Sequence, residues 1–261
     1  MSIVCDLWFV HCGLENREDE IMENAAIASW SGGKDSCLAV FRAIRSGIKI
    51  KYLLNFMSRE HKRCCFHGIE SRLIDLQAKC LGIPLVQKGV TPDMKKYEEE
   101  FKEAVTELKA EGINKMVFGD IYLLDQFNWV ERVCKDLAIA SIEPLWNNPA
   151  SEVVREFIKS GFKSIIVSAK DDVGGRDFIG RTIDEELVCE FERRKICPCG
   201  ENGEFHSFVV DGPIFKNRIE ILESEPVFKE GFWKHWFLDI KKYQMRPKFF
   251  QTAQQAESLL D

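Results

Sequence analysis

One short segment of the chain has the composition of an anion-binding loop. It lies between the apolar residues 25–30 and a helical pattern, and it reads Ser31, Gly32, Gly33, Lys34, Asp35, Ser36. Glycines let a backbone approach an anion closely, and the N–H groups of a helix's first turn then bind that anion. The serine hydroxyls add donors and the lysine adds positive charge. We therefore expect a phosphate-binding loop here, with Ser29 beside it at the end of a strand.

The loop differs from the two commonest nucleotide-binding motifs. A Walker loop requires a glycine five positions before its Gly-Lys pair and a serine or threonine after the lysine. Ala28 and Asp35 occupy those two positions, and the segment is not a GxGxxG pattern either. A glycine-rich turn with a serine or aspartate helix cap is the alternative interpretation of the same residues.

Two further segments carry acidic groups at positions that suit a site. Gly119 and Asp120 follow an apolar run, and the end of a parallel strand would bring Asp120 into the same crevice as the loop. Glu201 and Glu204 lie three residues apart in a glycine-bounded turn that ends at His206. Carboxylates of this kind hold Mg²⁺ against phosphate oxygens, or bind ammonium and accept its protons. An ordinary capped helix after Asp120, a solvated turn and a structural histidine are the alternatives.

Strand-like and helix-like segments alternate along the first part of the chain. Such alternation predicts right-handed βαβ units and a mostly parallel sheet with helices on both faces. We therefore expect an α/β fold with a doubly wound, mostly parallel, five-stranded, Rossmann-like sheet. Strands are expected at 25–30, 48–56, 84–87, 115–118 and 139–142, and helices at 36–46, 69–81, 93–111 and 126–137.

The pattern changes in the last third of the chain. A helix at 151–160 and a strand at 164–168 continue the alternation, but strands at 207–210, 219–228 and 232–240 are separated by turns alone. Strands joined in this way are typical of antiparallel sheets, so we expect a smaller C-terminal α+β domain. The predicted parts are an N-terminal extension at 1–21, a loop-bearing domain at 22–148 and a C-terminal domain at 149–261 that ends in a short helix.

Composition limits the classes of function. The chain has 261 residues and a formal net charge of −6, without the basic excess of proteins that bind nucleic acid stably. It has no apolar run of the roughly 18 residues that a membrane span requires, and no signal-peptide pattern at its start. We expect a cytoplasmic protein. The ten cysteines form no CxxC motif, which argues against a zinc or iron–sulfur site.

Several motifs together resemble one family. They are SGGKDS at 31–36, Gly-Asp-Ile at 119–121 with VERVC and PLW after it, FIGR at 178–181 and CGENGEFHSFVVDGPIF at 199–215. In this order they resemble the diphthine–ammonia ligase family. That family belongs to the N-type ATP pyrophosphatase (PP-loop) superfamily, which has an adenine nucleotide α-hydrolase-like fold. The glycine- and glutamate-rich segment is the family-specific part, whereas SGGKDS is shared across the superfamily.

The resemblance implies a reaction. It implies an ATP-dependent ligase that converts diphthine on translation elongation factor 2 to diphthamide with ammonium. The carboxylate would be activated as an acyl-adenylate, and the products would include AMP and pyrophosphate. Residues 22–148 would then be the PP-loop ATP-binding domain, and residues 149–261 would carry the substrate and ammonia site.

The resemblance also implies roles for individual residues. The catalytic residues would be Lys34, Asp35, Glu201 and Glu204, and Mg²⁺ would be held by Asp35 and Asp120. Ammonium and substrate would be bound by Glu201, Asn202, Gly203, Glu204 and His206. ATP would be bound by Ser29, Ser31, Gly32, Gly33, Lys34, Asp35, Ser36, Asn55, Gly119 and Asp120.

Other functions remain open at the level of the sequence. The same loop is compatible with tRNA thiolation, with amidation of a different carboxylate, or with nucleotide binding without chemistry. The loop at 63–70, which contains His67, is interpreted as solvated and slightly basic, with a position beside the acceptor pocket as the alternative. The aromatic segment at 228–236 fits either the core or a homodimer interface.

Overall fold

The structure is a computed structural model that describes residues 24–60, 62–64, 67–91, 93–230 and 234–248. The predicted N-terminal extension at 1–21 and the predicted terminal helix lie outside the described residues. None of the helices in the described residues has the length and apolarity needed to cross a membrane.

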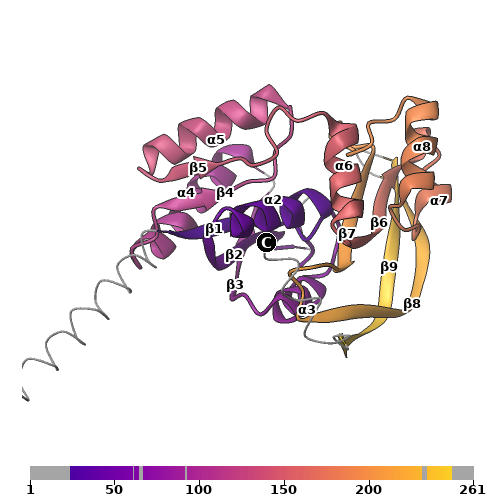
Figure 1. Ribbon diagram of the computed structural model, residues 1–261, viewed down its shortest axis with the longest axis horizontal. Coiled ribbons are helices and arrows are strands. Elements are labelled where there is room, and N and C mark those ends of the chain that lie inside the picture. The colour runs from indigo at the N-terminus through magenta and orange to yellow at the C-terminus, as the bar shows by residue number, and fades with distance from the viewer. Residues whose placement is uncertain (1–23, 61, 65–66, 92, 231–233, 249–261) are drawn as a thin grey trace, which may run out of the picture.

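The first sheet has five strands, all parallel, in the order β3-β2-β1-β4-β5 (Figure 1). This arrangement confirms the predicted α/β class and doubly wound topology, although the third strand runs further than 84–87. The strands are β1 (Ala25–Ser29), β2 (Lys49–Ser58), β3 (Leu85–Val90), β4 (Lys115–Val117) and β5 (Ala140–Ile142).

Both faces of this sheet are covered by helices. Alternate residues of β1 belong to different apolar cores, because successive side chains of a strand point to opposite faces. Ala26 and Ala28 pack with α2 and α3, whereas Ala25 and Ile27 pack with α4 and α5. The helices are α2 (Lys34–Arg45), α3 (Ser71–Leu81), α4 (Met94–Lys109) and α5 (Leu124–Asp136).

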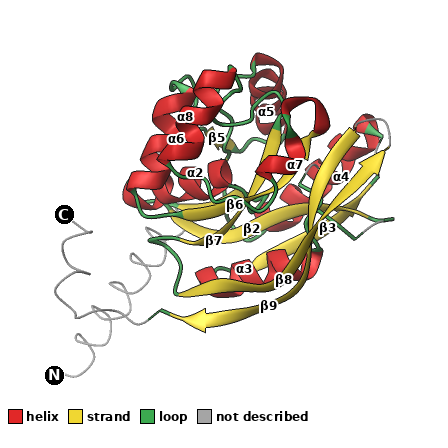
Figure 2. Cartoon of the chain, turned by 90° about the vertical axis from the view of Figure 1, so that its right-hand side faces the viewer, coloured by secondary structure: helices red, strands yellow, loops and turns green. Residues whose placement is uncertain are grey.

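The second sheet has four antiparallel strands in the order β7-β6-β9-β8. It confirms the predicted C-terminal α+β region. The strand expected at 164–168 belongs to this sheet and does not extend the parallel one. Figure 2 shows the long β8–β9 hairpin curving across the sheet. The elements are α6 (Ala150–Lys159), β6 (Lys163–Lys170), the 3₁₀ turn Asp171–Val173, α7 (Gly175–Phe178), α8 (Glu185–Arg194), β7 (Phe205–Asp211), β8 (Asn217–Glu230) and β9 (Lys234–Pro247).

The two sheets meet at the loop before α2. The Gly32 carbonyl accepts hydrogen bonds from the Val209 backbone N–H at 3.0 Å and from Gln77 Nε2 at 3.0 Å. Gln77 also donates to the Val209 carbonyl at 2.7 Å and accepts from Trp30 Nε1 at 3.0 Å. Gln77 is fully buried, and one apolar core extends through both sheets. The side chain of Gln77 therefore joins the loop, β1 and β7.

Replacement of Gln77 by leucine should destabilise the protein. Gln77→Leu leaves buried groups of Trp30 and Val209 without partners, and we expect the free energy of unfolding to fall by about 2–4 kcal/mol. Urea denaturation measures this change. Asp75→Asn, on the exposed side of the same helix, is the control and should change stability by less than about 0.5 kcal/mol. Equal stability of the two variants would show that the Gln77 network does not hold the sheets together.

Candidate active site

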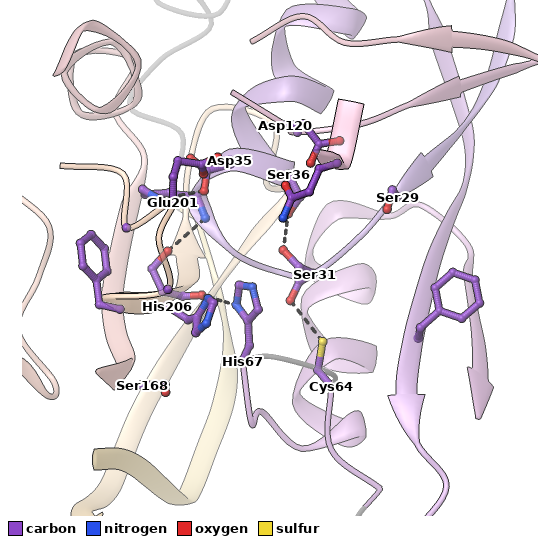
Figure 3. Close-up of a pocket in the computed structure, with 18 of the residues that line it drawn as sticks. Ser29, Ser31, Asp35, Ser36, Cys64, His67, Asp120, Ser168, Glu201 and His206 are labelled. Atoms are coloured by element: carbon purple, nitrogen blue, oxygen red, sulfur yellow. Dashed lines mark hydrogen bonds and ion pairs between the residues drawn. The ribbon is translucent and has the colours of Figure 1, made fainter. Parts of the chain in front are cut away.

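A cavity of about 1200 Å³ lies at the carboxyl ends of β1, β2 and β4 and reaches β6, β7 and β9 (Figure 3). This is the edge at which open parallel sheets bind ligands. The predicted residues that line it are Ser29, Ser31, Lys34, Asp35, Ser36, Asn55, Gly119, Asp120, Glu201, Asn202, Gly203 and His206.

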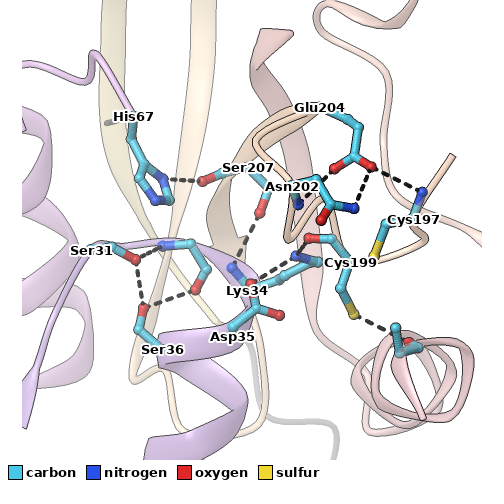
Figure 4. Close-up of polar contacts among 12 residues, drawn as sticks. Ser31, Lys34, Asp35, Ser36, His67, Cys197, Cys199, Asn202, Glu204 and Ser207 are labelled. Atoms are coloured by element: carbon cyan, nitrogen blue, oxygen red, sulfur yellow. Dashed lines mark hydrogen bonds and ion pairs between the residues drawn. The ribbon is translucent and has the colours of Figure 1, made fainter. Parts of the chain in front are cut away.

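The loop before α2 presents polar groups to this cavity. The Ser31 and Ser36 hydroxyls lie 3.2 Å apart, and Ser31 Oγ accepts a hydrogen bond from the Gly33 N–H at 3.3 Å (Figure 4). The N-cap position of α2 is Gly33, which supplies no side-chain cap. The first turn of α2 therefore retains the character of an anion-binding helix terminus.

Both loop glycines are required by their surroundings, although neither lines the cavity. Gly32 has a φ of +80°, a conformation that side chains disfavour. A Cβ on Gly33 would lie 2.7 Å from His67 Cε1 and 3.2 Å from the Ser207 carbonyl oxygen. The Ser207 hydroxyl oxygen accepts a hydrogen bond from the Lys34 backbone N–H at 3.1 Å. Strand β7 therefore packs against the loop and holds it in place.

Lys34 connects the two halves of the site. Its side chain is only 4% exposed, and Nζ donates to Asp35 Oδ2 at 2.7 Å and to the Cys199 carbonyl. Burial by itself lowers the pKa of Lys34, but the charges of Asp35, Cys199 and Glu201 outweigh it and raise that pKa above its ordinary value. Lys34 is therefore a fixed cation in the cavity.

Three carboxyl groups line the cavity together with Lys34. Burial, followed by the charge of Asp35, raises the pKa of Glu201 to about 8. The same two causes raise the pKa of Asp120 to about 6. Burial also raises the pKa of Asp35, whose Oδ1 is buried without a hydrogen-bond partner among the described residues. These carboxyl groups are buried close to one another, so a bound cation would favour their charged forms.

Gly119 allows Asp120 to approach the loop. A side chain at Gly119 would lie 3.0 Å from the backbone nitrogen of Ser36 and 3.0 Å from the carbonyl carbon of Asp35. The strand end after β4 thus packs directly on the first turn of α2. Asp120 thus lies in the same cavity as the loop, as predicted.

The structure separates the two glutamates that the sequence paired. Glu201 faces the cavity, whereas Glu204 does not line it. The Glu204 carboxylate accepts the Asn202 N–H at 2.9 Å, Asn202 Nδ2 at 3.0 Å and the Cys197 N–H at 3.4 Å (Figure 4). Glu204 therefore caps its own turn, and its carboxylate is engaged within that turn and does not face the cavity.

Asn55 lies in the wall of the cavity but its amide is already engaged. Asn55 Nδ2 donates to the Trp30 carbonyl at 2.8 Å and to Cys64 Sγ at 3.2 Å. Asn55 Oδ1 accepts from Gln87 Nε2 at 3.3 Å. The side chain thus holds the ends of β1 and β2 together beside Ser29.

Sequence reasoning missed an aromatic wall on one side of the cavity. Phe56 and Phe101 stack with ring centroids 5.4 Å apart, and Trp129 meets Phe101 edge-on at 5.1 Å. Tyr97 contacts both Phe56 and Trp129. Phe56 near the end of β2 and the i, i+4 pair of Tyr97 and Phe101 on α4 were available signals. Such a wall suits the face of a planar base.

For His67, the structure favours the alternative interpretation, in which its loop borders the pocket, over the preferred solvated one. The structure sets this residue in the cavity, where Nδ1 lies 3.1 Å from the Ser207 carbonyl and the ring lies 4.7 Å from that of His206. Burial lowers the pKa of His67 to about 4, and burial with His67 nearby lowers the pKa of His206 well below its usual range. Both imidazoles are therefore neutral at pH 7.

Comparison with known proteins places these features in one family. Residues 24–141 match the family model of the diphthamide synthase N-terminal domain, and residues 149–245 match that of the diphthamide synthase C-terminal domain. The chain belongs to the diphthamide synthase family. The predicted family and the prediction that the chain is an enzyme are confirmed by these matches.

The relatives of this diphthamide synthase family member include proteins named diphthine–ammonia ligase. The human protein is 29% identical over 220 residues, which cover 76% of this chain and 82% of that protein. The Schizosaccharomyces pombe protein is 25% identical over 217 residues, which cover 76% of this chain but 36% of that protein. A crystal structure of a predicted tRNA methyltransferase subunit from Methanocaldococcus jannaschii has a TM-score of 0.40 at 17% identity over 72% of this chain and 97% of that one, a likeness too distant to inform function.

In this member of the diphthamide synthase family, the raised pKa of Glu201 makes the stability of the protein depend on pH. Because the pKa of Glu201 is raised, the folded state binds more protons than the unfolded state between about pH 4.5 and pH 8. Stability should therefore fall as pH rises through that window. Glu201→Gln removes the contribution of Glu201 to this dependence, and we expect it to stabilise the free protein at pH 8 by more than about 1 kcal/mol relative to wild type.

Urea unfolding at pH 5 and pH 8 measures this effect. Glu186→Gln is the control, because it removes the same charge from an exposed position on α8. A Glu201→Gln protein that loses stability with pH as steeply as wild type would contradict the assigned environment.

Proposed function

We propose that this protein is an ATP-dependent ligase that amidates diphthine on translation elongation factor 2. Ammonium supplies the nitrogen, and the products are diphthamide, AMP and pyrophosphate. One observation carries the proposal: the loop before α2 and the Glu201 turn face the same cavity, with Lys34 touching both. The names of the relatives support the choice of substrate.

ATP would lie along the carboxyl edge of the parallel sheet. Its phosphates would accept hydrogen bonds from the loop and the first turn of α2, between Ser31 and Ser36. Its adenine would lie beside Ser29, against the aromatic wall that includes Phe56. Asn55 would act indirectly by holding the strand ends.

The acidic cluster fits a magnesium ion. Asp35 has an unpartnered buried oxygen, and Asp120 lies beside it with a raised pKa. The described residues contain no group of three or more ligating side chains, so phosphate oxygens and water would complete the coordination. Bound Mg²⁺ would neutralise charge on the phosphates. Asp35 and Asp120 would supply its protein oxygens.

The first step would activate the acceptor. A carboxylate oxygen attacks the α-phosphorus of ATP, the new O–P bond forms, and the bond from the α-phosphorus to the bridging oxygen breaks, releasing pyrophosphate. Lys34 is fixed by Asp35 and the Cys199 carbonyl, so its charge can stabilise the developing negative charge without rearrangement. The product is an acyl-adenylate, which is reactive enough for ammonia.

The second step would form the amide. Ammonium must lose a proton before it can attack, and a base with a pKa near neutrality suits that task. Glu201 has such a pKa and faces the cavity. Ammonia then attacks the acyl carbon, the C–O bond to AMP breaks, and AMP leaves with its oxygen. Glu204 would act by holding the turn that positions Glu201 and Asn202.

In this function both halves of the chain have a role. We propose that residues 22–148 bind ATP and that residues 149–261 provide the ammonium and acceptor sites, in the cytoplasm. Incubation of the protein with ATP, ammonium and elongation factor 2 bearing diphthine tests the proposal. Mass spectrometry should show conversion of the carboxyl group to the amide, and the absence of conversion would contradict the proposed substrate.

Removal of the Lys34 charge should abolish most ATP turnover. We expect Lys34→Ala to lower the rate of pyrophosphate release at least about 100-fold, which corresponds to ~3 kcal/mol of transition-state stabilisation. Lys79→Ala, on the exposed face of α3, is the control and should retain the wild-type rate. Circular dichroism checks that both variants fold. Unchanged pyrophosphate release by a folded Lys34→Ala protein would disprove the role of Lys34.

Replacement of Glu201 and of Glu204 by glutamine should affect amide formation to different extents. We expect Glu201→Gln to keep its ATP affinity within about threefold of wild type while amide formation falls at least about 100-fold, because a proton acceptor is lost. Glu204→Gln keeps the shape of the capping side chain and should lose less than about tenfold. Nucleotide titration and product mass spectrometry measure the two quantities. The reverse order of the two variants would assign the base to Glu204.

A further inference from the structure

The far end of the cavity, away from the aromatic wall, is built by the second sheet. Strand β6 contributes Ser168 and Lys170, β7 contributes His206, and β9 contributes His235 and Phe237. In register, Ser168 pairs with His206 on one side and with Phe237 on the other. Ser168 is thus in the middle of this wall. The role of these side chains is not explained by ATP binding.

Ser168 has a hydroxyl group without a partner. The residue is 1% exposed and lines the cavity, yet its Oγ has no hydrogen-bond partner among the described residues. Leaving a buried polar group unpaired destabilises a protein, so a hydroxyl in this position suits a ligand that completes its hydrogen bonds. Ser164, on the same strand, has an equally unpartnered hydroxyl but does not line the cavity.

The imidazoles beside Ser168 are uncharged hydrogen-bonding groups. A carbonyl oxygen only accepts hydrogen bonds, so the contact to the Ser207 carbonyl fixes the proton of His67 on Nδ1. The Nε2 atom of His67 is then an acceptor. Figure 3 shows the His67 and His206 rings together, with Ser168 near His206. An N–H group of His206 can donate to a ligand while His67 supports the ring.

This wall adjoins the phosphate loop. His67 packs on Gly33, because a Cβ on Gly33 would lie 2.7 Å from its ring. Ser207 connects the same strand to Lys34 through its hydroxyl and to His67 through its carbonyl. A group bound at Ser168 and His206 would therefore lie at the loop side of the cavity, on the same side as Lys34.

The chemistry of this end suits a carboxylate. A hydroxyl and an imidazole N–H are both donors to carboxylate oxygens, and Lys34 and Lys170, which line the same cavity, supply positive charge. Lys170 Nζ also donates to the Asn202 carbonyl at 2.7 Å, which keeps this cation next to the Glu201 turn. Glu201, the carboxyl group assigned to proton transfer, lies toward the loop.

We propose that Ser168 and His206 bind the carboxylate of the acceptor and present it to the α-phosphorus of ATP, with His67 as a positioning residue. This assignment rests on the proposed function, because the amidation requires a carboxylate acceptor. It adds an acceptor subsite on β6 and β7 to the nucleotide and ammonium sites. The His206 side chain then contacts substrate, and Ser168 supplies the second donor.

Steady-state kinetics with elongation factor 2 bearing diphthine tests the subsite. Ser168→Ala and His206→Asn should each raise the KM for the acceptor about tenfold or more, while the KM for ATP stays within about twofold. Ser164→Ala is the matched control and should leave both values unchanged. An unchanged acceptor KM in Ser168→Ala and His206→Asn, or an equal rise in both KM values, would overturn the assignment.

A second measurement does not depend on the identity of the acceptor. Sodium succinate serves as a carboxylate probe, titrated into protein with ¹⁵N-labelled histidine and observed by NMR. The His206 ring signals, assigned from His206→Asn, should shift saturably in wild type and in Ser164→Ala and should shift much less in Ser168→Ala. No shift in wild type, or equal shifts in all three proteins, would overturn the subsite. Failure of the wild type to amidate diphthine with a normal succinate response would instead contradict only the proposed function.

Discussion

The Gly32 carbonyl is the point on which the site depends. It accepts hydrogen bonds from β7 and from Gln77 on α3, so the turn that opens α2 is held against the second sheet. A loop supported only by its own helix would be free to move away from the C-terminal half. Here the same contacts that shape an anion-binding turn also bring the Cys199–Glu201 turn to within reach of Lys34. The proposed nucleotide and acceptor sites therefore lie in one cavity.

The cavity has an apolar aromatic wall and a polar wall, which suit the proposed ATP and the proposed carboxylate acceptor, respectively. Aromatic rings from β2, α4 and α5 form one wall, and imidazoles and a serine from the second sheet form the other. Carboxyl groups near Lys34 lie between them, and burial, followed by the charge of Asp35, raises the pKa values of Asp120 and Glu201. The proposed Mg²⁺ and ammonium ions are both cations and would offset the cost of keeping buried carboxyl groups here.

Much of the fold was predictable from the sequence, because a period of two residues in the strands and of 3.6 in the helices reflects burial directly. The loop was predictable because few arrangements need two glycines, two serines and a lysine after a buried strand. The sequence of a strand does not show which strand it pairs with, so it did not show that residues 164–168 belong to the antiparallel sheet. The sequence could not decide which glutamate faces the cavity, since that depends on the hydrogen bonds that Glu204 makes within its turn. The solvated interpretation was preferred for His67 because only the folded chain brings this residue to β7.

The central claim is that the turn held by β7 binds the triphosphate of ATP with the α-phosphate toward the acceptor. A crystal structure of the protein with α,β-methylene-ATP tests this claim most directly. The account predicts phosphates on the first turn of α2, the adenine at the aromatic wall, and the α-phosphorus nearest to Lys34 and the His206 wall. A nucleotide bound elsewhere, or bound with its γ-phosphate toward His206, would contradict the account, because the wrong bond would then face the acceptor.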